Sequence, residues 1–265
     1  MATAFQLAGV GAAVLALMMF VIWLVSVRLN NAGFVDVGWS LGLVLLAVWS
    51  AWQGPGFAPR RWIMAGMVTF WGLRLALHLI RRIVSEPEDG RYQQLRREWQ
   101  GKNIPLRFLV FFEFQALLDV LLSLPMLLGA LNSAPQLSAL EYAGVALWLV
   151  AVIGESISDA QLAAFKRDPG NRGRVCQQGL WRYSRHPNYF FEWFIWVAWM
   201  VYALASPWGW PSVVCPALML FFLFRVTGIP ATEAQALRSR GDEYARYQQT
   251  TSAFVPWFPK SQTAA

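Results

Sequence analysis

The chain has 265 residues, of which 57% are hydrophobic and only 14% are charged, and it carries 15 tryptophans. About a quarter of the residues of a soluble domain are charged, so this composition excludes an ordinary soluble domain and predicts an integral membrane protein. The net charge of +7 does not indicate nucleic acid binding, because the arginines lie between long apolar runs, as they do in the cytoplasmic loops of membrane proteins.

Apolar runs recur along the whole chain. A helix needs roughly 20 mostly apolar residues to cross a bilayer. We therefore predict an all-α, polytopic membrane bundle of about seven transmembrane helices, forming a single membrane domain over 1–265. The first run lacks the basic flank and cleavage site of a signal peptide. The predicted spans are 5–27, 37–52, 62–80, 108–131, 140–158, 189–204 and 212–226.

The basic residues between these spans predict the orientation in the membrane. The loop 81–107 holds seven Lys or Arg and the loop 160–187 holds six, and further basic residues lie in the tail 231–265. The loops after the fourth and sixth spans hold none. Because cytoplasmic loops are rich in Lys and Arg, we expect the N-terminus outside and the C-terminus in the cytoplasm. Arg60 and Arg61 lie on the other side and break the pattern.

Polar side chains lie within the spans in pairs. Residues four apart share one face of a helix, and ionisable groups at membrane depth usually line a cavity or pair with each other. We interpret four such pairs as the lining of one polar pocket, although each could instead face water at a helix end. The pairs are Arg74 with His78, Gln115 with Asp119, Glu155 with Asp159, and Asn188 with Glu192.

The loop 160–187 offers groups that suit a polyanion. Its basic residues crowd the start of the sixth span, where Arg185 and His186 precede Pro187. Arginine binds phosphate oxygens in pairs, and a helix start offers free backbone N–H groups. Tyr183 adds a stacking surface. The alternative is the ordinary excess of positive charge in a cytoplasmic loop, which needs no ligand.

Several short motifs occur along the chain from about Asp36 onward. The longest is Gly179-Leu180-Trp181-Arg182-Tyr183-Ser184-Arg185-His186-Pro187-Asn188-Tyr189, followed by Glu192. The others are Asp36-Val37-Gly38-Trp39, Trp71-Gly72-Leu73-Arg74, Asp89-Gly90-Arg91-Tyr92, Phe114-Gln115, Ser158-Asp159, Gly228-Ile229-Pro230, Asp242-Glu243-Tyr244 and Phe254-Val255-Pro256. Together they resemble membrane steroid 5-alpha-reductases and their bacterial relatives. The core of the longest motif is less specific, since it is similar to that of sterol reductases and of isoprenylcysteine carboxyl methyltransferases and phospholipid methyltransferases.

The resemblance implies a seven-helix reductase of the bacterial inner membrane that binds NADPH in a cavity facing the cytoplasm. In the steroid reductases a Glu and a Tyr hold the carbonyl of the enone. Trp71 stands at the position of that Tyr, and Asp36 is the nearest acidic residue to serve as the Glu, so the steroid itself is less well supported. The family's cofactor positions match Asp159, Arg174, Asn188, Glu192 and Trp196, with Lys166 or Arg167 as a further basic position and Arg74 on the third span.

The expected reaction is hydride transfer from NADPH to an activated C=C of a lipophilic enone that enters from the bilayer. Candidates for the proton donor or the carbonyl-binding group are Tyr92, His78, Gln115, Asp36 and a protonated Asp119. The phosphates of NADPH suit the arginines of the loop better than S-adenosylmethionine, whose sulfonium and ammonium favour acidic partners. An S-adenosylmethionine-dependent membrane methyltransferase remains the alternative. A non-catalytic lipid-binding or transport protein is the second alternative, and the oligomeric state stays open.

Overall fold

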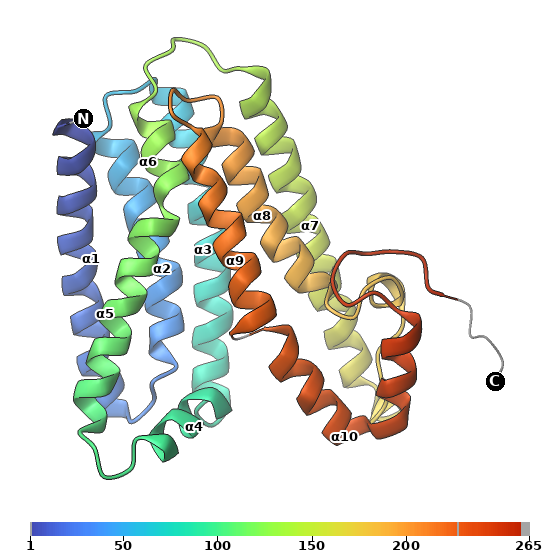
Figure 1. The fold of residues 1–265 in the computed structure, drawn as a ribbon. Coiled ribbons are helices and arrows are strands. Elements are labelled where there is room, and N and C mark those ends of the chain that lie inside the picture. Colours follow the sequence, from blue (N-terminus) through green and yellow to red (C-terminus); the bar gives the residue numbers. More distant parts are fainter. Residues whose placement is uncertain (1, 227, 261–265) are drawn as a thin grey trace. The chain divides into compact units, whose positions relative to one another are not determined.

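The computed structural model of the chain describes residues 2–226 and 228–260, and every regular element within them is helical. Three short 3-10 turns, Pro169–Asn171, Gly179–Arg182 and Trp210–Val213, complete the secondary structure. The prediction of an all-α protein is confirmed. The helices in chain order are α1 (Ala2–Leu29), α2 (Phe34–Gln53), α3 (Ala58–Ser85), α4 (Gly90–Glu98), α5 (Ile104–Leu122), α6 (Leu124–Leu131), α7 (Ala139–Arg167), α8 (Pro187–Ala203), α9 (Val214–Arg225) and α10 (Ile229–Thr250) (Figure 1).

Most of these helices can cross a membrane. Helix α8 has 17 residues, of which only Glu192 is charged. The stretch Trp210–Thr250 contains both α9 and α10. Helix α9 supplies its apolar part, because α10 carries six charged side chains. The membrane-helical architecture is therefore confirmed. The stretches long and apolar enough to span a bilayer are Thr3–Leu29, Phe34–Gln53, Ala58–Ser85, Ile104–Leu131, Ala139–Arg167 and Trp210–Thr250.

Three helical segments extend beyond the predicted spans. Helix α7 continues to Arg167, so the first part of the predicted loop 160–187 is helical, because its Ala, Gln, Leu and Lys residues favour a helix and Asp168 precedes a proline. Helix α3 likewise runs past the predicted end at residue 80 to Ser85. Most of the predicted tail 231–265 forms α10, which begins at Ile229 with a proline at the position where helices tolerate it.

The chain forms two compact units, where the sequence predicts a single domain. The first unit, here unit 1, comprises Met1–Glu141 and Tyr202–Ser212, and unit 2 comprises Tyr142–Val201 and Val213–Ala265. Unit 1 contains α1 to α6, with the α4 segment at one end of its bundle (Figure 1). Unit 2 contains almost all of α7 and α8, together with α9 and α10.

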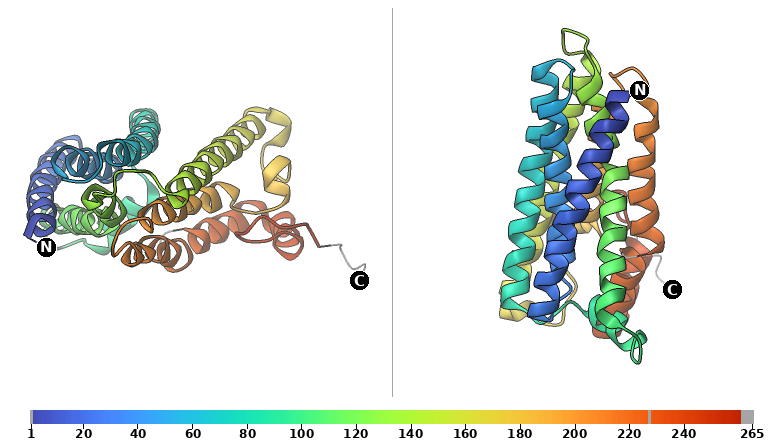
Figure 2. Two further views of the ribbon diagram at one scale, coloured as in Figure 1. Left: turned by 90° about the horizontal axis from the view of Figure 1, so that it is seen from above. Right: turned by 90° about the vertical axis from the view of Figure 1, so that its left-hand side faces the viewer.

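In unit 1, helix α2 packs against α1, α3, α5 and α6, and the helices run side by side (Figure 2). Two glycines allow this close packing, as small residues do between membrane helices. A Cβ at Gly72 of α3 would lie 2.5 Å from Cγ2 of Val44. A Cβ at Gly42 of α2 would overlap the carboxylate of Asp119 on α5 and lie 2.8 Å from Leu15. Gly42 therefore makes room for a buried carboxylate.

The two arginines that break the charge pattern have structural roles in unit 1. Arg60 is 1% exposed and forms an ion pair with Glu141, which is also 1% exposed. Its guanidinium donates to the carbonyls of Asn132 (2.9 Å), Ala134 (2.7 Å) and Gln136 (2.6 Å). Arg61 donates to carbonyls at the end of α2. These guanidiniums hold together the loops before α3 and before α7, which explains why the charge rule fails here.

In unit 2, the segment after α10 packs into an aromatic cluster. Phe254 is 6% exposed, and its ring lies 5.6 Å from Phe190, 5.7 Å from Trp193 and 5.2 Å from Phe224. The carbonyl of the same residue accepts the hydroxyl of Ser184 at 2.8 Å. The C-terminal segment thus fixes the loop that precedes α8, where the basic residues of the longest motif lie.

Candidate functional site

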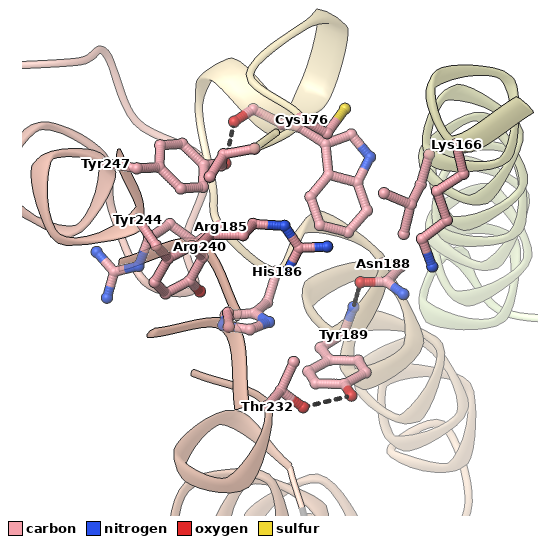
Figure 3. A pocket seen from close by; sticks show the side chains of 14 residues that line it. Lys166, Cys176, Arg185, His186, Asn188, Tyr189, Thr232, Arg240, Tyr244 and Tyr247 are labelled. Atoms are coloured by element: carbon pink, nitrogen blue, oxygen red, sulfur yellow. Dashed lines mark hydrogen bonds between the residues drawn. The ribbon is translucent and has the colours of Figure 1, made fainter. Parts of the chain in front are cut away.

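A cavity of about 210 Å³ lies within unit 2 (Figure 3). It is formed by the last turns of α7, the loop from residue 175 to α8, the first turn of α8 and one face of α10. Three cationic side chains and several aromatic rings line it, whereas none of its lining residues is acidic. The lining residues are Leu162, Lys166, Val175, Cys176, Trp181, Arg185, His186, Asn188, Tyr189, Thr232, Ala236, Arg240, Tyr244 and Tyr247.

Arg185 is the most firmly held of the cationic groups. Its side chain is 9% exposed, and its Nε donates to Oε1 of Glu233 at 2.6 Å. Its Nη1 donates to the carbonyl of Gln248 at 3.0 Å and to that of Thr251. These acceptors fix the direction of the guanidinium, which reaches into the cavity (Figure 3). These acceptors use Nε and Nη1, so Nη2 is the nitrogen that can donate to an anion in the cavity.

His186 shares the same carboxylate. Its Nε2 lies 3.3 Å from Oε1 of Glu233, its backbone N–H donates to the hydroxyl of Ser184 at 3.1 Å, and its ring stacks on that of Tyr189 at 5.3 Å. The side chain is 4% exposed. Glu233 therefore orients the two basic residues that the sequence places before α8, and sequence reasoning missed it because it lies on a polar helix 47 residues further on.

The start of α8 joins the cavity to α7. The Asn188 side chain donates to Oδ1 of Asp159 at 3.3 Å and accepts the N–H of Tyr189 at 3.0 Å. The Tyr189 hydroxyl lies 3.3 Å from that of Thr232 on α10. Two of the four predicted polar pairs thus meet in unit 2 through Asn188 and Asp159. Lys166 lines the cavity from α7 (Figure 3).

Helix α10 supplies a wall that sequence reasoning missed. Tyr244 and Tyr247 are 6% and 2% exposed, and the hydroxyl of Tyr247 donates to the carbonyls of Trp181 and Ser184, the latter at 3.1 Å. The spacing of three residues puts both phenols on one face of the helix. This spacing is the feature of the sequence that could have indicated that α10 forms a wall of the cavity. Arg240, on the same helix, donates from Nε to the carbonyl of Arg174 at 3.0 Å.

Several residues predicted to bind the cofactor do not line this cavity. Arg167 and Arg174 are exposed, and Tyr183 packs against Phe258 at 6.0 Å. Glu192 lies one turn beyond Asn188 and is half-buried. Trp196 is 0% exposed and packs against Trp199 at 4.8 Å. Of the predicted set in unit 2, the cavity therefore brings together Lys166, Arg185, His186 and Asn188, with Asp159 bonded to the last.

The predicted donor residues all lie in unit 1, and two of them form a pair. The buried hydroxyl of Tyr92, on α4, donates to Oδ1 of Asp36 at 2.7 Å, and Arg91 donates to the other oxygen at 3.1 Å. Burial and the Asp36 carboxylate raise the pKa of Tyr92 well above its usual value, so the phenol stays protonated. The sequence singles out both residues but does not indicate that they pair.

Asp89 orders the same group. Its side chain caps α4 by accepting the N–H of Arg91 at 2.9 Å, and it also accepts from the side chains of Arg91 and Arg82. Burial opposes ionisation of this carboxyl. The hydrogen bonds from Arg91 and the charges of Arg91 and Arg82 outweigh that effect and lower the pKa of Asp89 to about 2. The carboxylate therefore stays ionised at neutral pH.

The other unit 1 candidates do not join this pair. Asp119 is 0% exposed, and neither of its carboxylate oxygens has a hydrogen-bond partner among the described residues. Gln115 lies one turn away on α5 and is half-buried. On α3, Arg74 is half-buried and His78 is exposed. An unpaired buried carboxyl is costly, which makes Asp119 the most unusual of these residues.

Comparison with known proteins identifies the family. Residues 22–251 match the family described as "Protein of unknown function (DUF1295)". The chain belongs to this family, which is one of the steroid 5-alpha-reductase-like superfamily. An uncharacterized protein of Schizosaccharomyces pombe is 28% identical over 212 residues, which cover 70% of this chain. The chain spans only 62% of the length of that relative. No solved structure matches the chain.

Proposed function

We propose that this DUF1295 protein is an NADPH-dependent membrane reductase that acts on the activated C=C of a lipophilic enone. The observation that carries the proposal is the cavity of unit 2, whose lining includes Lys166, Arg185 and Arg240 and no acidic residue. A cavity with this charge selects an anion, and the phosphates of NADPH are the anions that the superfamily resemblance suggests.

The donors of the cavity fit one part of such a nucleotide. Its volume of about 210 Å³ is below the several hundred Å³ typical of pockets that enclose a whole drug-sized ligand. It has room for a phosphate-bearing ribose, with the guanidinium of Arg185 and the amine of Lys166 for the phosphate and the amide of Asn188 for a hydroxyl. The phenols of Tyr189 and Tyr244 offer flat surfaces beside these donors.

NADPH, when bound, supplies the hydride. Reduction of an enone also needs a group that stabilises charge on the carbonyl oxygen and delivers a proton. We assign this role first to Tyr92, whose phenol is protonated and donates its one O–H to Asp36 at 2.7 Å in the free protein. That proton would turn from Asp36 to the carbonyl oxygen when the enone binds. Asp36 accepts from Arg91 as well, so its charge is partly balanced while it orients the phenol.

The methyltransferase remains a second candidate on one observation. Trp181, Tyr189, Tyr244 and Tyr247 line the cavity, and aromatic faces attract a sulfonium as they attract other cations. Three cationic side chains in the same lining work against a cationic ligand. The charge of the cavity therefore favours NADPH over S-adenosylmethionine.

A thermal-shift experiment separates these functions. The full chain, purified in mild detergent, is heated with NADPH, NADH or S-adenosylmethionine, because a ligand that binds only the folded protein raises its Tm by mass action. We expect NADPH to raise the Tm most. A rise with S-adenosylmethionine and none with NADPH would establish the methyltransferase. No rise with any of the three would support the non-catalytic alternative, and consumption of NADPH with a lipophilic enone would support the reductase.

A further inference from the structure

An open groove lies along α5 in unit 1. It has a volume of about 650 Å³ and runs from the connection between α4 and α5 along the first turns of α5. Its walls include Trp99, Lys102, Leu106, Arg107, Val110 and Phe114. Every residue that lines it belongs to unit 1, and none of them lines the cationic cavity of unit 2.

One part of the groove is apolar and exposed. Leu106, Val110 and Phe114 recur every four residues on α5, so they share one face of the helix. Their exposed fractions are 53%, 65% and 49%. The stretch Ile104–Leu131 is long and apolar enough to cross a membrane, so such side chains face acyl chains rather than water.

The other part of the groove is cationic. Lys102 and Arg107 are exposed, and neither forms an ion pair with a residue that the structure describes. In contrast, three neighbouring arginines of the same segment are neutralised by carboxylates. Arg107 is held over the ring of Trp99, 5.7 Å from its centroid. The neutralised residues are Arg82 by Asp89, Arg91 by Asp36 and Arg96 by Glu88.

The turn that carries the two cations is fixed. The side chain of Asn103, between Lys102 and α5, accepts the N–H of Leu106 at 3.1 Å and caps the helix. Its backbone carbonyl also accepts the N–H of Arg107 at 3.1 Å. The cations therefore stand beside the first turn of a helix that is long and apolar enough to span a bilayer, a position at which basic side chains favour anionic headgroups.

We propose that this groove binds an anionic phospholipid. Lys102 and Arg107 bind the phosphate of the headgroup, and one acyl chain lies along Leu106, Val110 and Phe114. The positive charge of the groove favours an anionic headgroup. Its apolar wall favours a lipid over a free phosphate ion, because a free phosphate would contact only the two cations. This site is independent of the proposed nucleotide cavity.

Native mass spectrometry of the full chain tests the proposal with dioleoylphosphatidylglycerol and dioleoylphosphatidylcholine, which share their acyl chains. We expect the anionic lipid to bind about thirtyfold more tightly than the zwitterionic one, because each of the two basic residues near the headgroup contributes on the order of 1 kcal/mol. The variant K102Q/R107Q should bring the two affinities together. If this variant cannot be recovered, K102Q and R107Q are tested singly, each with a loss of about threefold to fivefold expected.

Two further variants serve as controls. One distinguishes binding of the headgroup from binding of the acyl chain, and the other distinguishes this site from the general positive charge of the segment. R81Q/R97Q removes two exposed cations from the same segment outside the groove, neither of which forms an ion pair within the described part of the chain. It should keep the preference for the anionic lipid. L106S/V110S should weaken both lipids together. Equal affinity of the wild-type protein for both lipids would overturn the proposal. An equal loss from R81Q/R97Q and K102Q/R107Q would also overturn it, because general basicity would then explain the preference.

Discussion

Oε1 of Glu233 accepts the Nε–H of Arg185 at 2.6 Å and lies 3.3 Å from Nε2 of His186, so a single carboxylate of α10 holds both basic side chains that precede α8. Arg185 lines the cavity and Glu233 does not. The carboxylate therefore partly neutralises the guanidinium from outside the cavity, and the lining of the cavity itself keeps only cationic charges. A bound phosphate would be a second anion on the same guanidinium.

This relationship predicts opposite effects of Glu233→Gln on stability and on ligand stabilisation. The free protein should lose roughly 1.5–3 kcal/mol, because a largely buried guanidinium loses its charged hydrogen-bond acceptor. The rise in Tm on adding NADPH should be larger than in the wild-type protein, because the phosphate replaces the lost charge. Asp242→Asn, an exposed carboxylate of the same helix, is the matched control and should change neither quantity. An unchanged NADPH shift in Glu233→Gln would place the phosphate away from Arg185.

The capping carboxylate of α4 predicts a dependence of stability on pH. The pKa of Asp89 is lowered to about 2 in the folded protein, from a usual value of 3.8. A depressed pKa contributes stability that is present above about pH 4 and is lost as the pH falls toward 2. The Tm of Asp89→Asn in detergent should therefore be lower than that of the wild-type protein at pH 6, and the difference should shrink as the pH is lowered toward 3. A constant difference across this range would show that the charge of Asp89 does not matter.

Some of the residues predicted to bind NADPH line the cavity and others do not. Substitutions in these two groups should therefore change the affinity for NADPH unequally. Asn188→Ala removes an amide that lines the cavity and contacts Asp159, and it should raise the Kd for NADPH about threefold to tenfold, as expected for the loss of a hydrogen bond to a ribose hydroxyl. Arg174→Ala removes an exposed side chain outside the cavity and should have a much smaller effect. Isothermal titration of both variants checks this order. The reverse order would place the nucleotide along the exposed loop.

The sequence predicts the membrane helices well because their signal is local. An apolar run such as 108–131 is visible without knowledge of the fold. The partners of the cavity were not visible in this way, because Glu233 and Tyr247 lie on a polar helix far along the chain from Arg185. Asp36 and Tyr92 are separate candidates in the sequence, named after the family resemblance, but their 2.7 Å hydrogen bond joins positions 56 residues apart and depends on how the fold brings α4 to the start of α2.

The Tyr92 hydroxyl is the proposed proton donor, so Tyr92→Phe should lower turnover without weakening the nucleotide. General acid catalysis contributes about 100-fold or more, and a loss of that size is expected in kcat. The NADPH-induced rise in Tm should be unchanged, because Tyr92 belongs to unit 1 and the cationic cavity lies in unit 2. Consumption of NADPH with a panel of lipophilic and water-soluble enones measures the effect. Full turnover by Tyr92→Phe would move the search for the donor to Asp119 and His78.

Gly42 and Asp119 provide a test of why a carboxylate is buried within the first unit. A Cβ at Gly42 would overlap Oδ2 of Asp119, so Gly42→Ala should destabilise the protein by about 1–3 kcal/mol, as overpacking does. Asp119→Ala removes a carboxylate whose oxygens have no hydrogen-bond partner among the described residues, so it should cost little or even stabilise. In the double variant Gly42→Ala/Asp119→Ala the new methyl group occupies the vacated space, and most of the stability should return. A double-mutant cycle of Tm values in detergent measures this coupling.

Additive losses would mean that the helices shift apart and that the two residues do not meet. Strong coupling, together with a loss of enone turnover in Asp119→Ala, would instead show that this costly carboxylate is kept for the reaction rather than for packing.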